Sequence, residues 1–300
     1  MGLEEELAGI AGAYGGTGAP VVHPTRTDVV VVRRGEVVVK AHSARDHAEA
    51  LRPRLRAAAS AALTGVMLPP LTPEVLQVAG RAVTVWPAGR PVAQDELDDA
   101  PWEEGARLLA ALHAVPLTGL PGLPAAGGPA RAARAVRRMT GDGPVERLVR
   151  RAFDGLPQEL FHGPAPEPFG ALGEAGPLPA LLTHGDWHLG QLVRRGRWLL
   201  IDVDDLGVGD PAWDLARPAA WYAAGLLHPD VWDRFLGAYL ASGGPALGRG
   251  DDPWRRLDVP ARALTVQLAA VAVVNAAGES RELDEVEHSL IEACNRIVRV

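Results

Sequence analysis

The sequence predicts an α+β protein with two lobes, a small β-rich lobe followed by a larger and mostly helical one. Up to residue 86, apolar residues come in short β-branched runs separated by turn residues, the pattern of strands joined by hairpins. Beyond residue 92, they follow the spacing of amphipathic helices. The Pro/Gly-containing residues 87–91 lie between the two patterns. We therefore expect a first lobe over residues 1–86, a hinge over 87–91 and a second lobe over 92–300.

The first lobe is expected to begin with a helix over Glu4–Ala13 and to continue as a β-sheet. Strands are predicted over residues 21–22, 29–33, 36–41, 75–78 and 82–86. A helix is predicted over residues 44–63, with a kink at Pro53 because proline has no backbone N–H to donate.

The second lobe is expected to consist mainly of helices. They are predicted over residues 102–114, 130–139, 145–153, 211–227, 229–241, 254–277 and 281–298. A β-hairpin with its turn at residues 194–197 is predicted to interrupt them, and residues 156–179 are expected to form a loop. The longest apolar run, residues 264–277, is shorter than the roughly 20 residues that a membrane span needs, so a buried helix is expected.

The composition narrows the class of protein. The net charge of −7 argues against a nucleic-acid binder, which normally carries a basic surplus on one face. Cys294 is the only cysteine, so no internal disulfide can form. The acidic N-terminus lacks the basic and apolar pattern of a signal peptide. We expect a cytoplasmic monomer or homodimer without nucleic-acid or membrane partners, and the acidic balance is compatible with a cationic small substrate.

The run His184-Gly185-Asp186-Trp187-His188-Leu189-Gly190-Gln191 is the most informative segment for function. Phosphoryl transfer needs a carboxylate beside the acceptor hydroxyl and oxygen ligands that hold Mg²⁺ on the triphosphate. Asp186 can supply the carboxylate. Gln191 and Asp202 can supply metal ligands, since the predicted hairpin would return Asp202 to the side of Gln191. A solvated loop amide is the alternative for Gln191.

Lys40 is the only lysine among 30 basic residues, and it lies at the end of a predicted strand. A compact ammonium on a flexible stem suits the phosphates of a nucleotide. Glu49, on the helix that follows, is expected to pair with Lys40. The alternative for Glu49 is the solvated face of an amphipathic helix.

Three motifs resemble those of the aminoglycoside phosphotransferase and choline kinase-like superfamily. They are His184 to Gln191, Ile201 to Asp205, and Gly209-Asp210-Pro211-Ala212-Trp213-Asp214-Leu215-Ala216. The resemblance implies a protein-kinase-like fold and the use of ATP or GTP with Mg²⁺. It further implies that Asp186 acts on the acceptor hydroxyl, that Lys40 binds phosphate, and that Gln191 and Asp202 bind the metal.

Two features depart from the family pattern. Gln191 stands where the family usually has Asn, and this version is familiar from maltokinases and bacterial glucosamine kinases, which favours a sugar acceptor. No Gly-rich phosphate loop occurs in residues 23–28, where Thr25 and Thr27 are the candidate phosphate contacts. The place of Trp86 and Ala88 in such a fold implies that their backbone meets the adenine.

The sequence therefore predicts an enzyme that moves the γ-phosphoryl group of ATP to a hydroxyl of a small polar acceptor. The first candidate is an aminoglycoside-type antibiotic or related aminocyclitol, and the alternative is a sugar or amino sugar. A catalytically silent binding protein on the same fold is the rival hypothesis. The missing Gly-rich loop supports that rival, whereas Asp186, Asp202 and Lys40 argue against it.

Overall fold

The structure is a computed structural model that describes residues 2–23, 25, 28–44, 48–93, 100–162, 180–248 and 250–299. The chain folds into two compact units that alternate along the sequence. The first unit contains Met1–Pro101, Val115–Pro124 and Leu189–Leu206, and the second contains Trp102–Ala114, Ala125–His188 and Gly207–Val300. The hinge expected at residues 87–91 stays a prediction. The division into two units rests on the contacts within each unit and does not test for a hinge.

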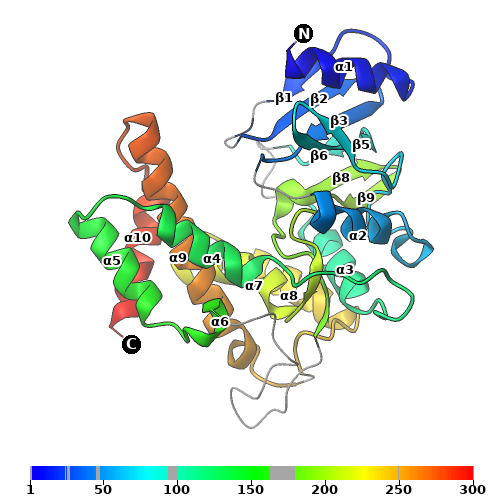
Figure 1. The fold of residues 1–300 in the computed structure, drawn as a ribbon. Helices are drawn as coiled ribbons and strands as arrows, with labels where there is room; N and C mark the ends of the chain where they lie inside the picture. The colour runs from blue at the N-terminus through cyan, green and yellow to red at the C-terminus, as the bar shows by residue number, and fades with distance from the viewer. Residues whose placement is uncertain are drawn as a thin grey trace. The chain divides into compact units, whose positions relative to one another are not determined.

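An antiparallel sheet forms the core of the first unit. In the described residues it has five strands in the order β1 (Val21–His23), β2 (Val30–Arg34), β3 (Val37–Ala41), β5 (Arg81–Pro87) and β4 (Leu76–Val78). Helix α1 (Leu3–Ala13) packs on β2 and β3 (Figure 1). In β3, Val37, Val39 and Ala41 are buried, so Lys40 lies on the opposite face of the sheet. The predicted strands are confirmed.

The helix predicted over residues 44–63 is shorter than expected. Helix α2 spans Ala48–Ala58, with Pro53 inside it, and a separate 3₁₀ turn, η1, spans Ala61–Leu63. Residues 45–47 lie outside the described residues, so the beginning of the prediction is not tested. Leu51 and Leu55 are buried, which places one face of α2 against the unit.

The predicted hairpin is confirmed, with a tighter turn. After a 3₁₀ turn, η2 (Leu189–Gln191), strand β8 (Leu192–Arg195) pairs with β9 (Arg197–Leu200) and with β6 (Arg90–Pro91). Arg195 pairs with Arg197. Gly196, with a φ of 73°, makes the turn because glycine adopts this left-handed conformation without steric cost. Leu192 and Leu200 are fully buried, and this anchors the hairpin.

The second unit is mostly helical. Its helices are α3 (Trp102–His113), α4 (Gly128–Arg138), α5 (Pro144–Asp154), α6 (Glu159–His162), α7 (Ala212–Ala224), α8 (Pro229–Ala241), α9 (Trp254–Glu279) and α10 (Glu285–Val298). Strands β7 (Leu181–Thr183) and β10 (Gly207–Gly209) form a short antiparallel pair. The predicted helices are confirmed, although α10 begins later than expected because the Asp284 side chain caps it. The loop expected over residues 156–179 is wrong at its beginning, where α6 lies, and residues 163–179 are outside the described residues. An α+β fold follows from the two units together.

Helix α9 is central to the second unit and packs against α4, α5, α7 and α10 (Figure 1). Within the described ranges, it is the one helix long and apolar enough to cross a membrane by length and composition, and 61% of its most apolar window is buried inside the protein. Leu264, Val266 and Ala269 are among its buried side chains. The buried helix expected over residues 264–277 is therefore part of α9.

Candidate functional site

Lys40 forms the centre of a charged cluster in the first unit. Its Nζ lies 2.9 Å from Asp202 Oδ1 and 2.8 Å from Asp204 Oδ2. Burial acts to lower the pKa of Lys40, but Asp202 and Asp204 outweigh it, so the pKa is raised above its ordinary value. Lys40 is therefore a permanent cation shared by two carboxylates.

Asp204 is held from several sides. Its Oδ1 lies 2.9 Å from His42 Nδ1, and His42 Nε2 lies 2.8 Å from Thr84 Oγ1. Arg54 donates hydrogen bonds to the backbone carbonyls of Asp204 and Leu206. Burial acts to raise the pKa of Asp204, yet Lys40 and His42 together hold it well below its ordinary value. Asp204 thus stays ionised although it is largely buried.

Asp202 and Gln191 lie at the two ends of the β8–β9 hairpin. Ile201 N donates to Gln191 O at 2.9 Å, and Gln191 Nε2 lies 3.3 Å from Asp202 Oδ2. Asp202 has a φ of 70°, a left-handed conformation that costs a non-glycine residue roughly 1–2 kcal/mol. Such strain is typical of functional sites, where a side chain must point in one direction.

These residues fit a Mg²⁺ ion. One ammonium faces two carboxylates, so the three groups carry a net negative charge, and Mg²⁺ is usually bound by one or two carboxylates together with substrate phosphates. The Gln191 amide must rotate by half a turn for its oxygen, instead of its nitrogen, to face the ion. Within the described part of the chain, no group of three or more His, Cys, Asp or Glu side chains forms a complete metal site. A site shared with phosphate oxygens is therefore the arrangement that fits.

The predicted pairing of Glu49 with Lys40 is wrong. Lys40 bonds Asp202 and Asp204 instead, while Glu49 is exposed in the first turn of α2. The Lys40 ammonium is thus bonded to residues more than 160 positions away. The local sequence pattern does not predict such a long-range contact. The solvated alternative for Glu49 agrees with its exposure.

The other residues of the first unit that were predicted to contact the nucleotide differ in how the structure bears on them. Thr25 is exposed, and its hydroxyl donates to Val29 O at 2.6 Å, so its phosphate contact stays a prediction. Thr27 lies outside the described residues. Trp86 is buried, and its Nε1 donates to Thr84 Oγ1. Ala88 N donates to Glu36 O, so this N–H is already committed inside the protein and is a poor candidate for an adenine contact.

Asp186 lies in the second unit between two arginines. Its Oδ2 is 2.7 Å from Arg131 Nη2, on α4, and its Oδ1 is 2.8 Å from Arg217 Nη2, on α7. Burial and the neighbouring Arg131 lower the pKa of Arg217, and Asp186 offsets this only in part. Neither arginine was singled out from the sequence, because each is one of 29 arginines in the chain and belongs to none of the three motifs.

Asp214 holds the loop that carries Asp186. It accepts hydrogen bonds from His184 N at 2.6 Å and Gly185 N at 2.8 Å, and its Oδ2 lies 2.9 Å from His113 Nε2. Burial acts to raise the pKa of Asp214, but the His113 hydrogen bond and its other partners lower it below the ordinary value. Asp214 therefore fixes the backbone of the loop that carries Asp186.

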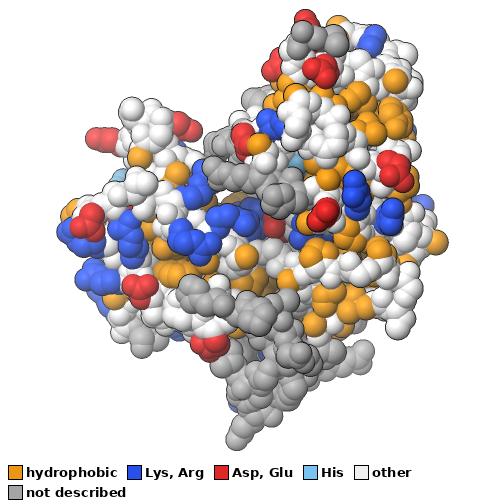
Figure 2. Space-filling model, in the orientation of Figure 1, with side chains coloured by type: hydrophobic (Ala, Val, Ile, Leu, Met, Phe, Trp, Pro, Cys, Tyr) orange, Lys and Arg blue, Asp and Glu red, His pale blue; other side chains and the backbone are white. Residues whose placement is uncertain are grey.

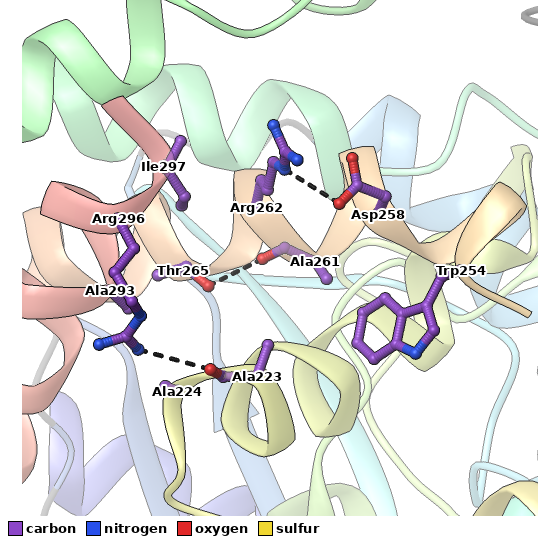
Figure 3. Close-up of a pocket in the computed structure, with 10 residues that line it drawn as sticks. All are labelled: Ala223, Ala224, Trp254, Asp258, Ala261, Arg262, Thr265, Ala293, Arg296 and Ile297. Atoms are coloured by element: carbon purple, nitrogen blue, oxygen red, sulfur yellow. Dashed lines mark hydrogen bonds and ion pairs between the residues drawn. The ribbon is translucent and has the colours of Figure 1, made fainter. Parts of the chain in front are cut away.

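Two cavities of the second unit differ in their relation to this loop. One, of about 130 Å³, is lined by Thr183, Gly185 and Asp210, by the beginning of α4, and by the aromatic rings of Phe161 and Trp213. The other, of about 190 Å³, lies where α7, α9 and α10 meet (Figure 3). Arg296 reaches the carbonyl of Ala223 there at 3.4 Å. Only the first cavity includes a residue of the catalytic-loop motif.

The sequence matches the phosphotransferase enzyme family (APH) over residues 23–257. The chain belongs to this family. No curated protein matches the sequence. The resemblance stated from the motifs is therefore confirmed for the family, and membership indicates a small-molecule phosphotransferase.

Solved structures of the same fold support this placement. A choline/ethanolamine kinase family protein from Mesorhizobium loti is 17% identical, with a TM-score of 0.61 over 99% of this chain and 94% of that one. A thermostable mutant of aminoglycoside phosphotransferase APH(4)-Ia is 17% identical, with a TM-score of 0.62 over 98% of both chains. Choline kinase LicA from Streptococcus pneumoniae is 11% identical, with a TM-score of 0.62 over 99% of both chains. The predicted kinase-like fold is confirmed.

Proposed function

We propose that this family member transfers the γ-phosphoryl group of ATP to a hydroxyl of a small polar acceptor. The observation that carries the proposal is the cluster in which the only lysine of the chain bonds Asp202 and Asp204, beside Gln191. Phosphoryl transfer is catalysed mainly by positioning and by neutralising phosphate charge, and this cluster offers an ammonium and metal ligands together. Solved structures of APH(4)-Ia with AMP-PNP and with ADP support a nucleotide as the donor.

Each cluster has its own task in the proposed reaction. Lys40 binds phosphate oxygens, while Asp202 and Gln191 hold Mg²⁺, which when bound offsets negative charge on the phosphates. Asp186 orients the acceptor hydroxyl and takes its proton as the new bond to phosphorus forms and the bond to the departing ADP oxygen breaks. Asp186 and Gln191 are five positions apart in the chain, which supports their acting on one phosphoryl group.

Two classes of acceptor are open within this proposal. An aminoglycoside or aminocyclitol is supported by the APH(4)-Ia complex with hygromycin B. A sugar or amino sugar is supported by Gln191. We propose further that the enzyme is a cytoplasmic monomer or homodimer that needs neither nucleic acid nor membrane as a partner, and that its phosphoryl donor is ATP or GTP.

Measuring both nucleotide binding and transfer tests the proposal. Calorimetry with ATP, with and without Mg²⁺, should show metal-dependent binding. Incubation with γ-labelled ATP and a panel of aminoglycosides, sugars, amino sugars and amino alcohols should label an acceptor. Failure of ATP to bind in either condition would contradict the proposal and favour the silent binding protein.

A further inference from the structure

The cavity of about 130 Å³ in the second unit adjoins the loop that carries Asp186. Gly185, the residue before Asp186, is part of its lining. The first turn of α4, residues 128–130, lines it as well, and the next residue, Arg131, bonds the Asp186 carboxylate at 2.7 Å. Two separate segments of the chain thus lead directly from the cavity wall to Asp186. A group bound in the cavity would therefore lie close to a hydroxyl that Asp186 orients.

Most of the cavity lining is apolar. The rings of Phe161 and Trp213 meet edge to face, with centroids 6.4 Å apart and planes at 87°. The other apolar side chains of the lining are smaller: Ala125, Ala126, Pro129, Ala130, Leu160 and Val208. Covering such a surface with an apolar group is favourable, because it removes apolar area from water. The two rings offer such a group an aromatic edge and face to pack against.

The oxygen-bearing side chains of the lining are already hydrogen-bonded. Thr183 Oγ1 donates to Gly207 O at 3.3 Å. Asp210 accepts from Arg256 at 2.9 Å with one oxygen and from a backbone N–H of α7 at 3.0 Å with the other. Among the described lining side chains, this leaves the indole N–H of Trp213, which is a donor only. An amino group entering the cavity would give up hydrogen bonds to water that the lining does not replace in full.

The arginines of α4 lie on the surface and do not line the cavity. Arg134 and Arg138 are exposed, and Figure 2 shows basic side chains gathered over α4 and α5. The helix reaches the cavity with residues 128–130 alone. A Cβ added at Gly128 would lie 3.2 Å from Trp213 Cε3, so the glycine lets the helix approach the indole closely. The cavity is therefore apolar although the outer surface of the same helix is basic.

The volume of the cavity fits a single ring. Apolar cavities of about 150 Å³ in proteins bind benzene. A pocket that takes a whole drug-sized ligand usually measures about 300 Å³ or more. At about 130 Å³, this cavity has the size of a subsite for one part of a larger molecule.

We propose that this cavity binds an apolar group of the acceptor, an aromatic ring or an alkyl group of similar size, beside the hydroxyl that is phosphorylated. The inference rests on the proposed phosphotransferase function. Within the proposed acceptor classes, it selects a sugar or aminocyclitol that bears an apolar substituent, because unsubstituted members carry hydroxyl or amino groups around most of the ring. Phe161 and Trp213 then determine specificity, while Asp186 acts on the hydroxyl.

Four alcohols test the proposal. Benzyl alcohol and phenyl glucoside carry an aromatic ring, whereas methyl glucoside and glucosamine do not. Their binding to the full chain is measured by calorimetry, without nucleotide and with MgADP, so that the result does not depend on turnover. We expect phenyl glucoside to bind about tenfold to a hundredfold more tightly than methyl glucoside, the gain that burial of one aromatic ring gives. Its heat-capacity change on binding should also be more negative, which marks apolar burial.

Two variants and a control locate the ring. Ala130→Leu adds an isopropyl group at an exposed position of α4 that lines the cavity, and leucine is nearly as good a helix former as alanine. Phe161→Ala removes one aromatic wall. Each should reduce the preference for phenyl over methyl glucoside about tenfold and leave MgADP binding unchanged. Ala277→Leu, at an exposed position of α9 outside the cavity, should leave the preference intact.

Three results would overturn the inference. Neither ring-bearing alcohol binds more tightly than methyl glucoside; the preference for the ring survives in both cavity variants; or phenyl glucoside, bound in the cavity, accepts labelled phosphate from ATP no better than methyl glucoside. Failure of the wild-type chain to bind MgATP would instead contradict the proposed function. Binding of the ring without nucleotide still decides on the cavity in that case.

Discussion

The two charged clusters of this protein use similar groups in opposite proportions. In the first unit, one ammonium, that of Lys40, faces the carboxylates of Asp202 and Asp204. In the second unit, one carboxylate, that of Asp186, faces two guanidinium groups. The first cluster leaves carboxylate oxygens that suit a metal ion, whereas in the second both oxygens of the carboxylate are already bonded to guanidinium groups. The same kinds of side chain therefore leave different groups available to a ligand.

The backbone positions the two clusters differently. Asp202 follows a hairpin whose strands fix its place, and its own residue adopts a left-handed conformation. Asp186 follows Gly185, which has a φ of 82° and whose amide is bound by Asp214. A sheet register thus positions Asp202, the carboxylate proposed to bind the metal, while buried hydrogen bonds position Asp186, the carboxylate proposed to face the acceptor.

The largest effect is expected from Asp186→Asn. The amide cannot take the hydroxyl proton, so turnover should fall by about 10² to 10⁴, the typical worth of general base catalysis. MgATP binding should persist, because Asp186 is not part of the Lys40 cluster. Labelled-phosphate transfer and calorimetry measure the two properties, with Asp233→Asn, an exposed residue of α8, as the control. Turnover within a few-fold of wild type would contradict the role assigned to Asp186.

Asp202→Ala should abolish metal-dependent nucleotide binding, with a loss of about a hundredfold or more. Asp204 keeps its bond to Lys40, so the variant removes one carboxylate from the cluster and leaves the ammonium paired. Titrating ATP at several Mg²⁺ concentrations measures the effect, and Glu74→Ala on the exposed surface of the same unit serves as the control. An unchanged affinity with the same metal dependence would refute the ligand assignment.

Asp214→Asn should weaken the second cluster without touching the first. It replaces a buried carboxylate that accepts from His184 N and Gly185 N, and breaking such a buried pair costs about 3 kcal/mol. Because the folded state lowers the pKa of Asp214 below 3.8, its stabilising contribution is complete above that value and is lost as the pH falls through the folded pKa. Unfolding free energies of the two proteins, measured from about pH 7 downward, should therefore differ by a constant amount at higher pH and approach each other as the pH falls below 3.8. A gap that does not narrow below pH 3.8 would contradict the role.

The Gln191 series should give the smallest and most graded effects. Gln191→Ala should raise the Mg²⁺ requirement and cut turnover, Gln191→Glu should change the metal preference by adding charge, and Gln191→Asn should be intermediate because its oxygen falls about one methylene short. Turnover against Mg²⁺ concentration separates the three variants. If turnover depended on Mg²⁺ concentration in the same way in all three variants, Gln191 would not be a metal ligand. Asp202 would then remain the one protein ligand proposed for the metal.

The sequence predicted the parts of the site that are contiguous in the chain. The catalytic-loop motif, the hairpin and the return of Asp202 beside Gln191 all depend on local spacing, and the structure has them. The pairing of Lys40 could not be predicted in this way, because it joins residues 162 and 164 positions apart and depends on how the sheet and the hairpin pack. Glu49 was chosen from helix position alone, and this was wrong.

The contacts of the arginines in the second unit could not be predicted from the sequence either. A helix was predicted over residues 130–139, but its spacing could not indicate which carboxylate its arginines would meet. Arg131 and Arg217 lie 55 and 31 positions from Asp186 in the chain, and only tertiary packing brings them onto its two oxygens. Asp204 lies in the Ile201 to Asp205 motif, but the motif alone does not indicate its contacts with Lys40 and His42. The spacing of two residues from Asp202, which is typical of side chains on one face of an extended segment, was the available signal.

Because Lys40 is the only lysine of the chain and is held in an ion pair, its reactivity can be used to measure how often the first unit opens. A protease specific for lysine can cut this chain only after residue 40, in the middle of the first unit, and the raised pKa of Lys40 keeps its amine protonated and slow to acylate. Cleavage into two fragments, or acylation at this one position, requires that strand β3 leave the sheet and that Asp202 and Asp204 release the ammonium. The rate of either reaction therefore measures how often the first unit opens, without any engineered label.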